Sequence, residues 1–106
     1  MKYVLVACAL LVSPAVANAG NEPRERMSFG SARTTPDMHQ CLDQKLAFLG
    51  VPVVAGTAPL TTIAYGQGKD QVDVEITDGG DLRTVTVKAV RKLPAHRQDD
   101  IRSCMY

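Results

Sequence analysis

Apolar and polar positions along the chain follow helical spacing first and strict alternation later. Between residues 35 and 50 the apolar residues recur every three or four positions and form one face of a predicted helix: Met38, Cys41, Leu42, Leu46 and Leu49. Thr35 is expected at the N-cap, with Pro36 at the first helical position and Asp37 in the first turn. Gly50 is expected to end this helix, because glycine is favoured just after a helix C-terminus.

Alternation after residue 50 predicts strands. Residues 60–65 form one candidate strand. Pro52 confines residues 51–54 to a sheet edge or an extended linker, because proline cannot donate a hydrogen bond to a strand ladder. Gly66, Gly68 and Asp70 indicate the turn that follows residues 60–65, and its length leaves open whether Ile63 or Ala64 faces the core.

The clearest local signal is a β-hairpin. Residues 71–77 and 82–90 alternate and flank Asp78-Gly79-Gly80-Asp81, which favours Gly79-Gly80 as a two-residue turn. That turn predicts one apolar and one polar set of cross-strand pairs: Val74 with Val85 and Val72 with Val87, then Glu75 with Thr84 and Asp73 with Thr86.

A second helix is predicted from about Ala95 to the end, with Ile101, Cys104 and Met105 on one face. The resulting fold class is α+β: an antiparallel sheet of three to four strands, with an N-terminal and a C-terminal helix packed on its apolar side. Cys41 and Cys104 remain once residues 1–19 are removed, so we expect a disulfide between them to link the two helices.

Residues 1–19 resemble a cleavable signal peptide. Lys2 is followed by an apolar stretch and by a small-residue cleavage site, Ala17-Asn18-Ala19. The stretch is too short for a membrane span, which needs about 20 apolar residues, and Cys8 leaves a lipid-anchored alternative. The sequence therefore predicts export to the periplasm, or alternatively secretion, with a flexible polar leader over residues 20–34 and a single disulfide-stapled domain over residues 35–106.

Charge narrows the choice of partners. The chain has 12 Lys and Arg against 11 Asp and Glu, and removal of the signal takes away Lys2, so the remainder is balanced. Nucleic acids and anionic membranes are bound chiefly through an excess of basic charge. We therefore expect neither a nucleic-acid partner nor stable membrane insertion after cleavage.

No motif indicates catalysis, a cofactor or a metal ion. No serine lies in a nucleophile elbow, and both cysteines are expected to be paired. The pair His39 and Asp43 could orient an imidazole, but a solvated helix face explains it better. A turn likewise explains residues 66–69 better than a phosphate-binding loop does, and a solvated strand explains Asp73, Glu75 and Asp78 better than a calcium site does. The sequence thus predicts a protein without an enzymatic site.

One surface could receive an acidic protein partner. Positive charge is concentrated where the last strand leads into the final helix, at five candidate binding residues: Lys88, Arg91, Lys92, His96 and Arg97. The polar face of the hairpin is the alternative surface. We therefore expect a small exported protein that binds another protein, of the inhibitor or immunity type. The alternative is an accessory subunit of an envelope or secretion assembly, docked by a strand edge or by the N-terminal segment.

Overall fold

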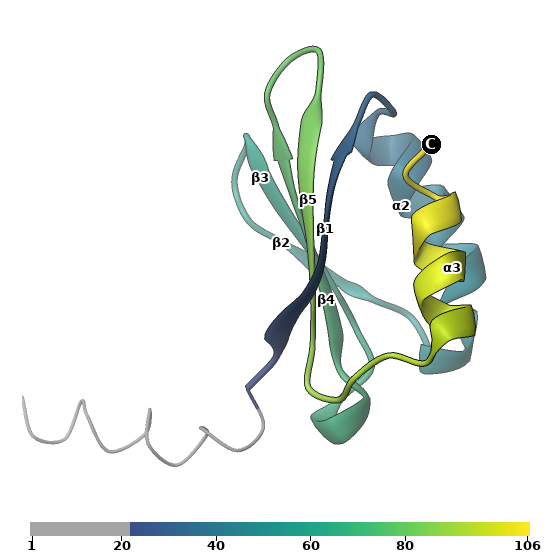
Figure 1. The fold of residues 1–106 in the computed structure, drawn as a ribbon. Coiled ribbons are helices and arrows are strands. Elements are labelled where there is room, and N and C mark those ends of the chain that lie inside the picture. The colour runs from purple at the N-terminus through teal and green to yellow at the C-terminus, as the bar shows by residue number, and fades with distance from the viewer. Residues whose placement is uncertain (1–21) are drawn as a thin grey trace, which may run out of the picture.

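The computed structural model describes residues 22–106, so the predicted signal peptide and its cleavage site lie outside the described residues. The fold is α+β, as predicted, with a single antiparallel sheet in the order β1-β5-β4-β3-β2. Figure 1 shows the helices α2 and α3 on the same side of this sheet, running in opposite directions. The strands are β1 (Arg24–Ser31), β2 (Val53–Ala55), β3 (Leu60–Tyr65), β4 (Val72–Asp78) and β5 (Arg83–Ala89). The helices are α2 (Thr35–Lys45) and α3 (Ala95–Ser103), with short 3-10 turns η2 (Ala47–Leu49) and η3 (Gly68–Asp70).

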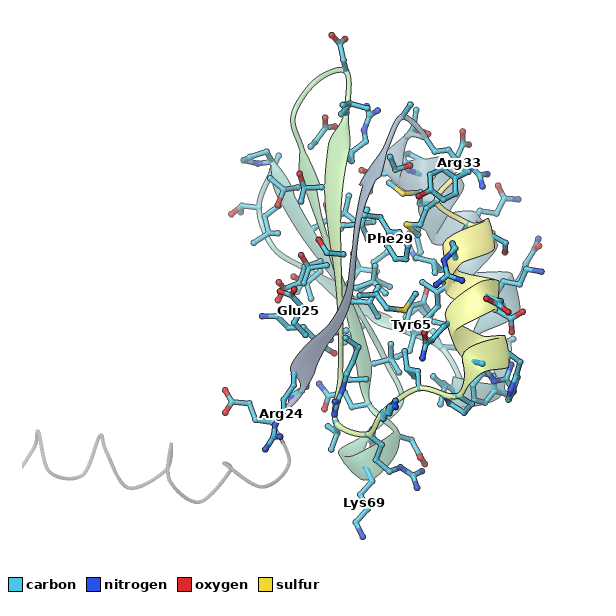
Figure 2. All side chains as sticks on the ribbon, viewed as in Figure 1. Arg24, Glu25, Phe29, Arg33, Tyr65 and Lys69 are labelled. Carbon is cyan, nitrogen blue, oxygen red and sulfur yellow. A yellow bond between two sulfur atoms is a disulfide. The ribbon has the colours of Figure 1, made fainter. Side chains whose placement is uncertain are left out.

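Strand β1 corrects the predicted sheet. The sequence predicts a flexible leader over residues 20–34, whereas Arg24–Ser31 pairs along its length with β5 and makes a fifth strand. The reason is the alternation of Met27, Phe29 and Ser31, which brings these side chains against the core while polar neighbours face outward. Figure 2 shows Phe29 in the space between sheet and helices, and Glu25 on the other side. The described domain therefore begins before residue 35.

The first helix is not N-terminal to the sheet, because α2 follows β1 in the chain. Its N-cap is Thr34 rather than Thr35: the Thr34 hydroxyl accepts a hydrogen bond from the Asp37 backbone N–H at 3.3 Å. The α-helix ends at Lys45, and the predicted remainder is the tighter turn η2. Gly50 ends that turn with a φ of +92°, a conformation that favours glycine.

The hairpin of β4 and β5 has the predicted faces but a different register. Val74 pairs with Val87, rather than with Val85, and Glu75 pairs with Thr86. The loop is longer than a two-residue turn, because Gly79 N–H donates to the Leu82 carbonyl and the Asp78 carboxylate accepts from Gly80 N–H, both at 2.9 Å. A shift by two residues keeps each side chain on its face, so the core is unaffected.

The core lies between the sheet and the helices. It is formed by fully buried apolar side chains of β3, β4, β5 and both helices, with Ile63 rather than Ala64 facing inward. The disulfide joins Cys41 of α2 to Cys104, the C-cap of α3, with 5.5 Å between the Cα atoms. No helix in residues 22–106 is long and apolar enough to cross a membrane.

The C-terminal end is fastened to the end of β1. The buried Ser31 hydroxyl donates to the Met105 carbonyl at 2.5 Å and accepts from the Arg33 backbone N–H at 3.1 Å. The Arg33 guanidinium donates to the Cys104 carbonyl at 3.1 Å. These bonds satisfy carbonyl groups at the end of α3 that have no partner within the helix. They also explain why Ser31 can be polar and yet buried.

Candidate functional site

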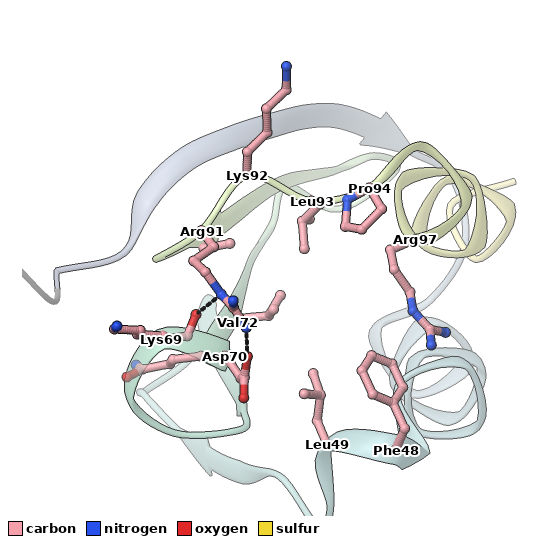
Figure 3. Close-up of a pocket in the computed structure, with 12 residues that line it drawn as sticks. Phe48, Leu49, Lys69, Asp70, Val72, Arg91, Lys92, Leu93, Pro94 and Arg97 are labelled. Atoms are coloured by element: carbon pink, nitrogen blue, oxygen red, sulfur yellow. Dashed lines mark hydrogen bonds and ion pairs between the residues drawn. The ribbon is translucent and has the colours of Figure 1, made fainter.

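The structure places three of the five candidate basic residues, Arg91, Lys92 and Arg97, around one cavity. This cavity has a volume of about 320 Å³ and lies where the ends of β4 and β5 meet the start of α3 and the turns η2 and η3. Figure 3 shows it open between these elements. We call it the basic-rimmed cavity; its lining consists of Phe48, Leu49, Lys69, Asp70, Gln71, Val72, Ala89, Arg91, Lys92, Leu93, Pro94 and Arg97.

Lys88 and His96 are not part of the cavity lining. In β5 the buried residues Val87 and Ala89 face the core, so Lys88 between them lies on the opposite face. Its ammonium group pairs with the Glu75 carboxylate of β4 at 3.2 Å. His96 is exposed on the first turn of α3. The predicted five-residue patch is therefore divided between different surfaces.

Arg91 holds the η3 turn against the end of β5. Its guanidinium forms an ion pair with the Asp70 carboxylate and donates from Nε to the Lys69 carbonyl at 3.3 Å. Figure 3 shows both contacts at one side of the cavity. Arg91 and Asp70 are both largely exposed, so this ion pair contributes little stability but reduces the free positive charge there.

Arg97 lies at the other side of the cavity, over the ring of Phe48. The centre of the guanidinium is 3.7 Å from the ring centroid, a cation–π distance. Its Nη1 also forms an ion pair with the Asp100 carboxylate at 3.3 Å. Phe48 is 58% exposed although it is large and apolar, so it forms a wall of the cavity rather than part of the core. Phe48 is not among the site residues predicted from the sequence.

Apolar side chains form the cavity floor. Val72 and Ala89 face inward from paired positions at the ends of β4 and β5 and are almost fully buried. Leu49 and Leu93 are partly buried against the same core. The Lys92 side chain points away from the cavity into solvent (Figure 3). The cavity can thus hold an apolar group between two guanidinium groups.

A second concave surface adjoins the first and shares Phe48, Leu49 and Asp70 with it. Its volume is about 440 Å³, and its further lining comes from Val51, Val53, Ala64, Gly66 and Gln67. Val51 is 92% exposed, and Val53 and Val54 of the edge strand β2 are also exposed. β2 is the last strand in the sheet order, so the backbone edge that faces away from β3 is not paired within the sheet.

His39 and Asp43 belong to a network that anchors α2 to the sheet. The Tyr65 hydroxyl of β3 donates to one oxygen of the Asp43 carboxylate at 2.6 Å, and His39 Nε2 lies 3.3 Å from the other. Burial, followed by the bond to the Asp43 carboxylate, raises the pKa of Tyr65 well above its usual value. Tyr65 is therefore a protonated, fully buried hydrogen-bond donor at neutral pH.

The other candidate motifs have structural roles. Residues 66–69 lie in the turn between β3 and β4. Asp73 accepts hydrogen bonds from Gln71, Glu75 pairs with Lys88, and Asp78 lies 3.6 Å from Arg83 Nε. Within residues 22–106, no group of three or more His, Cys, Asp or Glu residues could hold a metal ion.

Comparisons with known proteins return no match: no family model fits the chain, and no curated protein and no solved structure matches it.

Proposed function

We propose that this chain is an exported, non-enzymatic protein that binds another protein, and that the basic-rimmed cavity is part of its binding surface. Periplasmic localisation is part of the proposal and rests on the signal-like residues 1–19. Inhibitors and immunity proteins against envelope-acting enzymes or toxins belong to this class.

The single observation that carries the proposal is the composition of the cavity. An open concavity with an apolar floor and an arginine at each of two sides is typical of a binding site. Arginine and aromatic residues also contribute much of the binding energy at protein interfaces, and here Arg97 and Phe48 are in contact.

The excess of basic residues in the cavity lining supports an acidic partner. The lining contains Lys69, Arg91, Lys92 and Arg97 against a single acidic residue, Asp70, whereas residues 20–106 as a whole are balanced. A local excess of one sign in a concave surface attracts the opposite charge and accelerates association.

A second candidate function is an accessory subunit docked through the edge of β2. The observation that favours it is the exposed apolar run Val51, Val53 and Val54 beside a strand edge that has no partner strand among residues 22–106. A partner strand could add main-chain hydrogen bonds there. The sequence also left open that an accessory subunit docks through its N-terminal segment, residues 20–34. This is disfavoured because Arg24–Ser31 is already part of the sheet.

Site-specific photo-crosslinking tests both functions. A photoreactive residue is introduced in place of Lys92 at the cavity rim, Val54 at the β2 edge, or Thr84 on the polar sheet face, three exposed positions on different surfaces. Crosslinking is carried out in cells that export the protein. A protein adduct at position 92 but not at 84 supports the proposal, and an adduct at position 54 alone favours the accessory subunit. An adduct at position 84 alone assigns the polar face, and absence of a specific adduct at all three positions contradicts protein binding.

A further inference from the structure

We infer that the basic-rimmed cavity binds a carboxylate that stands next to an apolar side chain, presented by an acidic segment of a protein partner. The inference rests on the proposed function and adds the chemistry of the group that enters the cavity. It is carried by the position of the two arginines relative to the apolar floor and by the size of the cavity.

The floor of the cavity can bind the apolar part of the ligand. Val72 and Ala89 are almost fully buried, and Leu49 and Leu93 pack against the core beside them, so the floor is rigid and apolar. The cavity volume of about 320 Å³ lies at the lower end of the roughly 300–1,000 Å³ typical of ligand sites. It suits one or two side chains rather than a nucleotide-sized cofactor.

Arg97 can bind the carboxylate of the ligand. A guanidinium carries five N–H donors in a planar fork, and Arg97 uses one terminal nitrogen for Asp100. The centre of the guanidinium lies over the Phe48 ring, 3.7 Å from its centroid, and this contact helps to hold the guanidinium at the side of the cavity. The remaining donors can bind a carboxylate in the bidentate geometry that arginine favours.

The arrangement favours a single negative charge over a polyanion. Arg91 is already paired with Asp70, and the Lys92 side chain points away from the cavity. A phosphate-rich ligand would require several cations that converge on one point. Within residues 22–106, Arg97 has both Nε and Nη2 unused beside the apolar floor, whereas Arg91 has only Nη1 unused. This favours a single carboxylate attached to an apolar group.

The test uses small probes titrated into the ¹⁵N-labelled protein while amide shifts are followed by NMR. N-acetyl-leucine carries both groups, N-acetyl-leucinamide lacks the charge, and acetate lacks the apolar part. We expect N-acetyl-leucine to shift the amides of Val72, Leu93 and Arg97 at concentrations at which the other two probes do not. Equal shifts from all three probes, or no saturable shift from N-acetyl-leucine, would overturn the inference.

A matched pair of variants assigns the carboxylate to Arg97. Arg97→Gln should weaken binding of N-acetyl-leucine by about tenfold, the effect of losing a charged hydrogen bond. The control is Arg102→Gln, which removes an exposed arginine of the same helix with an equivalent i,i+3 partner, Asp99, away from the cavity. Equal affinities in Arg97→Gln and Arg102→Gln would refute the role of Arg97.

Two further outcomes separate the inference from the proposed function. N-acetyl-leucyl-aspartic acid α-amide, in which only the side-chain carboxyl group is free, distinguishes an internal acidic residue from a chain terminus, and we expect it to bind at least as well as N-acetyl-leucine. A protein adduct at position 92 without saturable binding of any probe would leave the proposed function in place and overturn the inference. Specific probe binding without any protein adduct would contradict the proposed function instead.

Discussion

Replacement of Tyr65 by phenylalanine should destabilise the domain by a small amount at neutral pH. The substitution leaves no large cavity in the core, so the loss should come from the hydroxyl group alone. The ring of Tyr65 is fully buried, and phenylalanine retains it, so only the hydroxyl is lost. That hydroxyl donates to the Asp43 carboxylate at 2.6 Å. A hydrogen bond to a charged group contributes about 1.5–3 kcal/mol. Because the Asp43 side chain is 43% exposed and can bind water instead, we expect a loss of only about 1 kcal/mol.

The same variant should alter stability at alkaline pH. The pKa of Tyr65 is raised in the folded protein above its unfolded value of 10.0. Below about pH 10 the phenol is protonated in both states and the stabilisation is fully present. Above it the unfolded state loses its proton while the folded state keeps it, so stability falls by about 1.4 kcal/mol per pH unit. Tyr65→Phe should lack this component of the alkaline loss.

Unfolding in guanidinium chloride, followed by circular dichroism at several pH values between 7 and 11, measures both effects. Tyr106→Phe is the control, because Tyr106 is 75% exposed at the end of the chain. We expect the parent protein to lose its advantage over Tyr65→Phe as pH rises from 10 to 11, so that the two free energies of unfolding meet and then cross, while Tyr106→Phe follows the parent. Parallel curves for Tyr65→Phe and the parent would refute the reasoning, and so would an unchanged stability at pH 7.

Two further predictions concern the disulfide and the hydrogen bond that hold the C-terminal end of the chain. Replacing Cys41 and Cys104 together by alanine should cost about 4 kcal/mol in the same unfolding assay, because the bridge spans 63 residues and restricts the unfolded chain; free thiols in the native oxidised protein would contradict the pairing. Ser31→Ala should cost about 1–3 kcal/mol, because it leaves a buried carbonyl without its donor, whereas the exposed Ser28→Ala on the same strand should change stability by less than about half a kcal/mol. Equal losses in the two serine variants would show that the bond to Met105 contributes nothing.

The hairpin shows which part of a strand pairing can be predicted from alternation. Alternation has a period of two residues, so it assigns each side chain to a face but does not distinguish registers that differ by two. Charge does distinguish them here. A turn at Gly79-Gly80 would place Asp78 opposite Asp81, whereas in the structure Asp78 lies opposite Arg83, with 3.6 Å between carboxylate and guanidinium. Like charges that face each other across a pair of strands are destabilising, and this was the signal for the longer loop.

Strand β1 could not be predicted from local pattern, because its partner is about 60 residues away in the sequence. Its alternation covers only Met27, Phe29 and Ser31, and charged residues precede it. Charged side chains and an irregular register, both present near Glu25, are common on edge strands, where they discourage pairing with other chains. The features that made residues 20–34 look like a leader are therefore those of a protected sheet edge.

Only part of the candidate site could be predicted from the sequence, because one of its walls comes from a segment far away in the chain. The basic residues predicted for the site are neighbours in the chain, but the alternation of side chains in β5 places Lys88 on the opposite face of the sheet. Phe48, from a distant segment, had no local signal. The disulfide supplies one: Phe48 lies seven residues after Cys41, and Arg97 lies seven residues before Cys104. In two antiparallel helices joined at these cysteines, equal steps of about two turns in opposite chain directions lead to neighbouring positions. The predicted bridge thus already implied the contact between Phe48 and Arg97, provided that the helices run in opposite directions, as Figure 1 shows.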